Sequence, residues 1–283
     1  AGTDSRSYVQ FGHGGWTSTG AAAGDSMLRA GADFSLIGGT GGSVDDDKAL
    51  YAMVGHGGWD SDGTSATGSG HSGNIMVSSG SGALATAGVG DGLGDFAGLG
   101  DFDLDGIADV INFGADVSGN AGRIGSGVGI LLQGGSGIVN DDDAFAMIGH
   151  GGRSSDGAHN GNIGVAATQG ISLLGGTAYR SFAQIGHGGL ASNGNLSGDI
   201  SVISTAGNLV VSTGTGTEAY AMIGHGDDRV TDATLNSTGA RTGDILVQVN
   251  DWSISGNATT VGQSGHRSSN ANAGLVEPTN LQL

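Results

Sequence analysis

The sequence contains no cysteine and a single proline, and only 13% of its 283 residues are charged. Without cysteine there can be neither disulfide bonds nor thiolate metal sites. A single proline, in a chain without glycine at every third position, excludes a collagen triple helix. No apolar run approaches the roughly 20 residues that a helix needs to span a bilayer, so we expect no membrane insertion.

Basic residues are also scarce. Nine Lys and Arg stand against 27 Asp and Glu, which gives a formal net charge of −18. A surface of this sign repels nucleic acid and attracts cations. We therefore expect no nucleic-acid partner and regard cations as the natural ligands.

Glycine, in contrast, is abundant, with 61 residues. Short apolar runs, such as residues 200–203 and 209–211, recur between clusters of Gly, Ser and Asn. The mean hydropathy of −0.01 leaves enough apolar surface to bury. This pattern is typical of short strands joined by tight turns and favours an ordered, all-β chain over disorder.

A nine-residue motif occurs five times, and each copy carries one histidine. The copies YVQFGHGGW, YAMVGHGGW, FAMIGHGGR, FAQIGHGGL and YAMIGHGDD begin at Tyr8, Tyr51, Phe145, Phe182 and Tyr220. Their histidines are 43, 94, 37 and 38 residues apart. The long interval predicts a degenerate copy, which we place at residues 110–116 with Ala115 at the histidine position. A weaker seventh copy is predicted at residues 261–266.

Two further apolar segments follow the motif, so each repeat contains three. The second segment of the repeat has the pattern Gly-Asn/Asp-Ile-x-Val and lies at residues 74–77, 162–165, 199–202 and 244–247. The third lies at residues 33–36, 171–174, 209–211 and 252–254. Three short strands per repeat predict a three-sided coil, which cannot bury its inward row alone and must stack on its neighbours. The sequence therefore predicts a parallel β-helix (β-solenoid) of about seven degenerate repeats of 37–43 residues, with one or two turns each.

The apolar alternation also predicts which side chains face inward. We assign Tyr51 and Met53 to the interior from the first strand, Ile75 and Val77 from the second, and residues like Leu173 from the third. A shift of one residue in this assignment stays open.

The repeats resemble those of filamentous-haemagglutinin-like bacterial adhesins, through Tyr-Ala-x-Ile-Gly-His-Gly-Gly followed by Gly-Asp/Asn-Ile-x-Val. The resemblance covers nearly the whole chain. It implies a right-handed β-helix, export from the bacterium, and a role in adhesion, biofilm or surface fibres. The polar N-terminus shows no signal-peptide pattern, so we expect a mature or excised form.

A different pattern interrupts the repeats at residues 86–112. Asp101, Asp103, Asp105 and Asp109 form Asp-x-Asp-x-Asp-Gly-x-x-Asp, with the Ile107 carbonyl at the expected backbone-ligand position. Alternate carboxylates in a tight loop converge on one hard cation, so we predict a calcium site here. The stretch also resembles the FG-GAP calcium loops of integrin-like propellers. An exposed acidic turn is the alternative.

Other candidate residues have a structural interpretation beside a functional one. The motif histidines are favoured as corner residues that stack or bond to the backbone, with metal binding or pH response as the alternative. The triplets at residues 45–47 and 141–143 are favoured as exposed loop residues, with weak cation binding as the alternative. Trp16 and Trp59 are favoured as packing residues, with stacking on sugar rings as the alternative.

We therefore expect solenoid repeats at residues 1–85, an acidic insertion at 86–112, and solenoid repeats from 113 to 283. The sequence shows no Gly-x-Ser-x-Gly elbow, no His-Glu-x-x-His site and no basic cluster like that of a lyase, so we expect no enzyme. The expected function is a structural or adhesive extracellular filament protein of a bacterial surface. Its expected partners are further copies of itself, assembled end to end or laterally, or the neighbouring repeats of a longer chain. A carbohydrate-binding or carbohydrate-active β-helix protein, with host or matrix carbohydrate as partner, is the alternative.

Overall fold

The computed structural model describes residues 6–41, 49–63, 68–79, 128–137, 143–204, 206–226, 239–256, 259–261 and 281–282. Within these ranges the regular elements are all β-strands, and every strand pair is parallel. The same ranges contain no helix that is long and apolar enough to cross a membrane. The predicted all-β, parallel-sheet character is confirmed.

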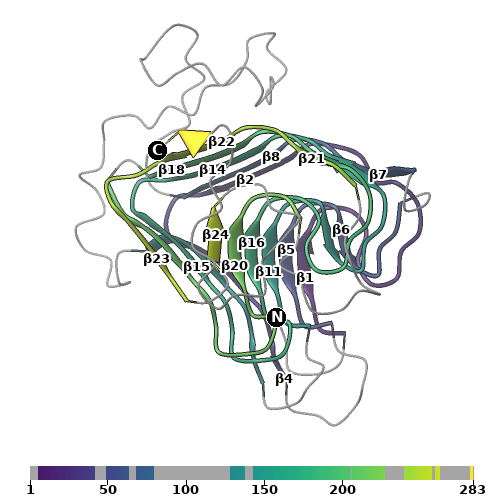
Figure 1. Cartoon of the computed structure of the whole chain (residues 1–283), viewed down its shortest axis with the longest axis horizontal. Helices are drawn as coiled ribbons and strands as arrows, with labels where there is room; N and C mark the ends of the chain where they lie inside the picture. The colour runs from purple at the N-terminus through teal and green to yellow at the C-terminus, as the bar shows by residue number, and fades with distance from the viewer. Residues whose placement is uncertain are drawn as a thin grey trace, which may run out of the picture.

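Three large sheets contain most of the strands (Figure 1). The first sheet contains, in order, β1 (Val9–Phe11), β5 (Ala52–Val54), β11 (Ala146–Ile148), β16 (Ala183–Ile185), β20 (Ala221–Ile223) and β24 (Thr259–Val261). The second contains β2 (Ser26–Ala30), β8 (Ile75–Ser79), β14 (Ile163–Ala167), β18 (Ile200–Ser204), β22 (Ile245–Gln248) and β25 (Leu281–Gln282). The third contains β3 (Phe34–Ile37), β9 (Val128–Gln133), β15 (Gly170–Leu174), β19 (Leu209–Ser212) and β23 (Trp252–Ser255). These sheets correspond to the three strands predicted per repeat.

Smaller sheets lie at the corners. A four-stranded sheet precedes the second sheet and contains β7 (Ser69–Ser72), β13 (Ala158–Asn160), β17 (Leu196–Ser197) and β21 (Arg241–Thr242). Two pairs complete the set: β6 (Gly57–Trp59) with β12 (Gly151–Arg153), and β4 (Thr40–Gly41) with β10 (Ser136–Gly137). These short strands are rich in Gly and Ser, and sequence reasoning did not predict them.

The strand register shows that each repeat makes one turn. Val9 pairs with Ala52, and Ala183 pairs with both Ala146 and Ala221, so each first-sheet strand lies beside its equivalent in the next repeat. We call one circuit of the chain a rung and number the rungs 1 to 6 by their first-sheet strands, from β1 to β24. The described residues thus form six rungs, and the arrangement is compatible with a β-solenoid.

The predicted degenerate copy is not a rung between the second and third motifs. Ala52 of β5 pairs directly with Ala146 of β11, and hydrogen-bonded parallel strands leave no room for another strand between them. Residues 80–127 instead connect β8 to β9 within rung 2. The conformation of residues 110–116 themselves lies outside the described ranges.

The predicted seventh copy is described only at its first residue. Val261 pairs with Ile223 at the end of the first sheet. Residues 262–266 lie outside the described ranges.

The main core lies between the three large sheets. Its buried side chains include the predicted Ile75, Val77 and Leu173, which are confirmed as inward. In the first strand, however, Ala52 and Val54 face this core, so the assignment of Tyr51 and Met53 to it was wrong by one residue.

Tyr51 and Met53 belong to a second core on the opposite side of the first sheet. It is built from aromatic, Met, Leu and Ala side chains: Ala49, Tyr51, Met53, Phe145, Met147, Phe182, Leu190, Tyr220 and Met222. Because both faces of this sheet are buried, its strands show no regular apolar–polar alternation, and the sequence could not indicate which face points toward the main core.

The first glycine of the motif allows the rungs to approach one another. Gly55 has φ of 132°, and a Cβ there would overlap the carbonyl oxygen of Gly149 in the next rung. A side chain at this position would therefore strain the turn and push the two rungs apart.

Candidate functional site: the ladders between rungs

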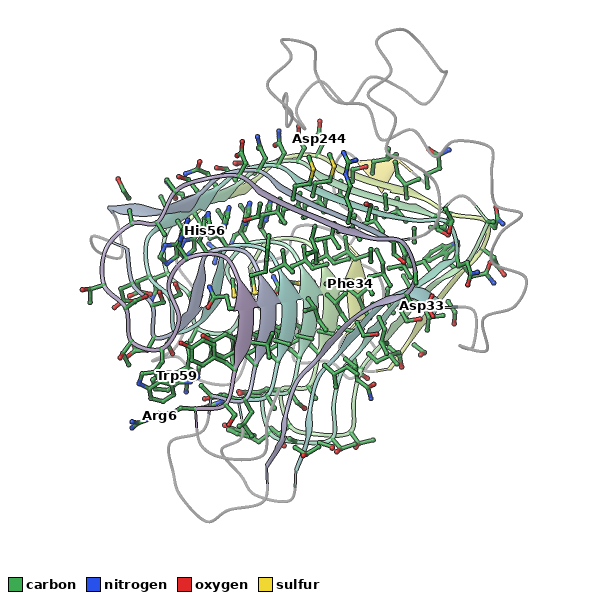
Figure 2. All side chains as sticks on the ribbon, turned by 180° about the vertical axis from the view of Figure 1, so that it is seen from behind. Arg6, Asp33, Phe34, His56, Trp59 and Asp244 are labelled. Atoms are coloured by element: carbon green, nitrogen blue, oxygen red, sulfur yellow. The ribbon has the colours of Figure 1, made fainter. Side chains whose placement is uncertain are left out.

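The motif histidines form one continuous stack beside the main core. Ring centroids of successive histidines lie 4.8–4.9 Å apart, with interplanar angles between 2° and 22°. The stack contains His13, His56, His150, His187 and His225. Figure 2 shows His56 in the space between the first and the second sheet.

Each of the four later histidines binds the preceding rung with both ring nitrogens. In His150, Nδ1 accepts a hydrogen bond from the backbone N–H of His56 at 3.0 Å. Its Nε2 lies 2.7 Å from the carbonyl oxygen of Gly73, which can only accept, so Nε2 carries the proton. The same pair of bonds is made by His56, His187 and His225, with distances of 2.7–3.0 Å.

This arrangement keeps the later histidines neutral. Burial lowers the pKa of His150 and His187 well below the usual value, and lowers the pKa of His225 to about 4. With one nitrogen accepting and the other donating, neither ring position is open to a metal ion. The described residues contain no group of three His, Asp or Glu that could hold one. The favoured interpretation, stacking and backbone bonding, is confirmed for these histidines.

A second histidine pair lies at the corner before the second sheet. The rings of His71 and His159 stack at 5.1 Å, and the backbone N–H of His71 donates to Nδ1 of His159 at 3.0 Å. Desolvation by burial lowers the pKa of His159 to about 3. Sequence reasoning missed this pair because it occurs in only two rungs, while Leu196 and Arg241 hold the next two positions of the column.

A ladder of Asp and Asn runs in the opposite sense. The Oδ1 atom of Asp25 accepts the backbone N–H of Asn74, and Oδ1 of Asn74 accepts the N–H of Asn162. Asp199 and Asp244 continue the column at 2.9 Å. These bonds explain why the repeat requires Asp or Asn before the second strand: its side chain binds the following rung.

The aromatic residues that open each motif form the third ladder. Successive rings of Tyr8, Tyr51, Phe145, Phe182 and Tyr220 lie 4.7–4.9 Å apart and nearly parallel. All of these rings except that of Tyr8 belong to the second core. Stacked aromatic pairs of this kind stabilise the contact beyond the area that they bury.

The two tryptophans that follow the motif pack against each other and against arginines. Trp16 and Trp59 stack at 4.1 Å, and the guanidinium of Arg6 lies 4.7 Å from the Trp16 ring. Arg153, in the next rung, lies 5.1 Å from the Trp59 ring, so Trp59 is covered by a neighbour on each side. Figure 2 shows Arg6 and Trp59 at the same edge. These contacts agree with packing and leave little ring surface for a sugar.

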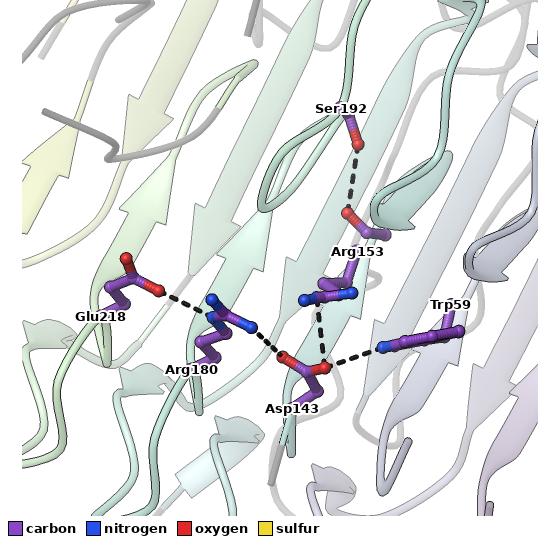
Figure 3. Close-up of polar contacts among 7 residues, drawn as sticks. Trp59, Asp143, Arg153, Arg180, Ser192 and Glu218 are labelled. Atoms are coloured by element: carbon purple, nitrogen blue, oxygen red, sulfur yellow. Dashed lines mark hydrogen bonds and ion pairs between the residues drawn. The ribbon is translucent and has the colours of Figure 1, made fainter. Parts of the chain in front are cut away.

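A charged cluster lies beside Trp59 (Figure 3). The Asp143 carboxylate accepts a hydrogen bond from Nε1 of Trp59 at 2.8 Å and pairs with Arg153 at 3.1 Å and Arg180 at 3.8 Å. Arg180 also pairs with Glu218 at 2.9 Å. Asp143 is 5% exposed, so its prediction as an exposed loop residue was wrong. The other triplet residues lie outside the described ranges.

The predicted calcium ligands Asp101, Asp103, Asp105, Ile107 and Asp109 also lie outside the described ranges. The structure therefore describes a repeat whose shared side chains bind neighbouring rungs. Comparisons with protein-family models, with curated proteins and with solved structures found no match for this chain.

Proposed function

We propose that this chain is a right-handed parallel β-helix (β-solenoid) that serves as a structural or adhesive element of a bacterial surface or extracellular filament. Right-handed crossovers are the sense that nearly all parallel strand connections adopt. The observation that carries the proposal is the set of ladders. His, Asp or Asn, and aromatic side chains of the repeat each bind the adjacent rung, so the repeat is built for stacking.

The surface chemistry supports the same role. A net charge of −18 keeps a long rod soluble, and Trp59, the best candidate for binding a sugar ring, is occupied by Trp16 and Arg153. This favours a structural element over a carbohydrate-binding protein. The resemblance of the repeat to filamentous-haemagglutinin-like adhesins points to the same class.

The proposal is tested on cells that produce the protein. Antibodies raised against the purified chain should label intact, unpermeabilised cells or their extracellular fibres, and deletion of the coding sequence should reduce attachment to surfaces. An antibody against a cytosolic protein serves as the control for lysis. Label confined to permeabilised cells would contradict a surface role.

Calcium binding by the acidic insertion is a second part of the proposal. Asp101, Asp103, Asp105 and Asp109, with the Ile107 carbonyl, supply the oxygen ligands that Ca²⁺ prefers, and the ion would neutralise their repulsion. Titration calorimetry with CaCl₂ should show saturable binding. Asp103→Ala should abolish it, whereas Asp251→Ala, at an exposed position of a different loop, should not. Equal binding by both variants would contradict the site.

A further inference from the structure

The outer face of the second sheet is buried at its centre, although no described segment packs on it. The side chains of Met76, Ala166 and Ser201 are 1%, 0% and 1% exposed. Each alternates along its strand with residues of the main core, so each points to the opposite side of the sheet. They belong to neither core. Figures 1 and 2 show no described strand on that outer side.

The burial is confined to rungs 2 to 4. One row of outward positions contains, from rung 1 to rung 5, Arg29, Ser78, Ala166, Ile203 and Gln248. The three central members are 8%, 0% and 7% exposed. The two outer members, which hold equivalent positions, are exposed to solvent. A covering segment must therefore reach the middle of the face and leave both of its sides open.

The connections between strands identify one segment that has the length to do so. In rungs 1, 3, 4 and 5, two to four residues lead from the second sheet to the third. In rung 2 this connection consists of residues 80–127, which begin directly after β8, one of the covered strands. Residues 262–280 are needed elsewhere, because every earlier rung uses 14 to 21 residues to pass from the first sheet to the second.

The chemistry of this connection fits the face. The centre of the face is uncharged and largely apolar, with Met76, Ala166 and Ile203 on adjacent rungs. Residues 80–127 include three phenylalanines and several Leu, Ile and Val residues, and no other connection between the second and the third sheet carries such a supply. Removal of both apolar surfaces from water favours their contact.

We propose that residues 80–127 dock on the outer face of the second sheet, over rungs 2 to 4, through their apolar side chains. The acidic insertion is then held on the flank of the solenoid as part of the folded body. This docking does not depend on the proposed surface role of the protein.

The absence of native cysteine allows a test by thiol labelling of single-cysteine variants. In the full chain, Ser201→Cys should react with a maleimide at least tenfold more slowly than Gln248→Cys, which lies on the same face but is exposed. Replacing residues 80–127 by Thr-Gln, the connection at residues 168–169 in rung 3, should raise the rate at Ser201→Cys at least tenfold. Ending the chain at Val261 should leave that rate unchanged.

A second variant tests the docking within the full chain. Met76→Lys places a charge on the face and should raise the labelling of Ser201→Cys at least tenfold, with an unchanged circular dichroism spectrum. Ser35→Lys, at an exposed position of the third sheet, should not. Unchanged labelling in the Met76→Lys chain would overturn the proposal, as would slow labelling that persists without residues 80–127. Protection lost only in the chain that ends at Val261 would assign the face to another segment and also overturn it.

Discussion

The inner rungs and rung 1 contain the same residue types in the same register, but only the inner ones bury them. Tyr51 is fully buried between Tyr8 and Phe145, whereas Tyr8 is 41% exposed and, among the described residues, stacks on Tyr51 alone. The difference shows that a repeat gains its core and its hydrogen-bond partners from adjacent rungs. Stability in such a chain is a sum over interfaces between neighbours, as in other repeat proteins.

Mild acid should destabilise the inner rungs, and this is the largest effect that we expect. His150, His159, His187 and His225 have pKa values far below 6.5 because they are buried, whereas in the unfolded chain they take up protons near pH 6.5. Their contribution is fully present above pH 6.5 and is lost as the pH falls toward the folded pKa values. Protonation of the unfolded chain begins above pH 6.5, so each histidine loses about 1.4 kcal/mol between pH 7.5 and 5.5, and the four together lose on the order of 6 kcal/mol over that range.

Urea denaturation followed by circular dichroism at pH 7.5, 6.5 and 5.5 measures this effect. The midpoint should change little between the first two values and fall steeply at the third. An unchanged midpoint at pH 5.5 would show that the buried imidazoles are not neutral donors and acceptors.

Adding a side chain where two inner rungs lie in close contact should have the next largest effect. Gly186 has φ of 150°, and a Cβ there would overlap the carbonyl oxygen of Gly224. Gly186→Ala should cost on the order of 5 kcal/mol, because backbone strain and overpacking act together. Gly31→Ala in rung 1 meets nothing within 4 Å and should change stability by less than about 1 kcal/mol. Comparable urea midpoints for the two variants would contradict the close approach of the rungs.

Removing a histidine from an inner rung should cost more stability than removing the equivalent histidine from rung 1. His150→Phe keeps a ring in the stack but leaves the N–H of His56 and the carbonyl of Gly73 without this partner. We expect a loss of about 2 to 4 kcal/mol, since each orphaned buried group costs about 1 to 3. His13→Phe, at the exposed end, should cost less than about 1 kcal/mol. Thermal unfolding of both variants measures the difference, and a larger loss from His13→Phe would reverse the assigned direction of the ladder.

The charged cluster should give the smallest effect. Asp143→Asn removes the charge that Arg153 and Arg180 share and weakens the bond from Trp59, so we expect a loss of about 1 to 3 kcal/mol. Glu218→Gln affects a carboxylate that is 21% exposed and should cost less than about 1 kcal/mol. The ratio of the two losses, measured by urea denaturation, separates a buried hub from a surface ion pair.

The sequence predicted the repeating part of the fold because each motif combines a turn with a strand. Ile75, Val77 and Leu173 could be placed correctly because the second and third strands each have an apolar row. The inward face of the first strand could not be predicted, because both faces of this strand are buried and apolar and polar residues do not alternate regularly along it.

Features that depend on contacts between residues far apart in the sequence could not be predicted from the sequence. The segment at residues 110–116 resembles a strand but is not placed between β5 and β11, and only pairing of Ala52 with Ala146 reveals this. His71 and His159 each stand three residues before the Asn-Ile-x-Val of the second strand, so the sequence aligns them, but the hydrogen bond between them is seen only in the structure. The roles of the motif histidine and of the Asp or Asn before the second strand became clear only through their partners in adjacent rungs.

The ladder of histidines is the central claim, and hydrogen-bond scalar coupling tests it most directly. In ¹⁵N-labelled protein, NMR should detect coupling between the backbone nitrogen of His56 and Nδ1 of His150, which lie 94 residues apart in the sequence. The account predicts this coupling, with the proton of His150 on Nε2. A His150 ring protonated on Nδ1, with no coupling to His56, would contradict it.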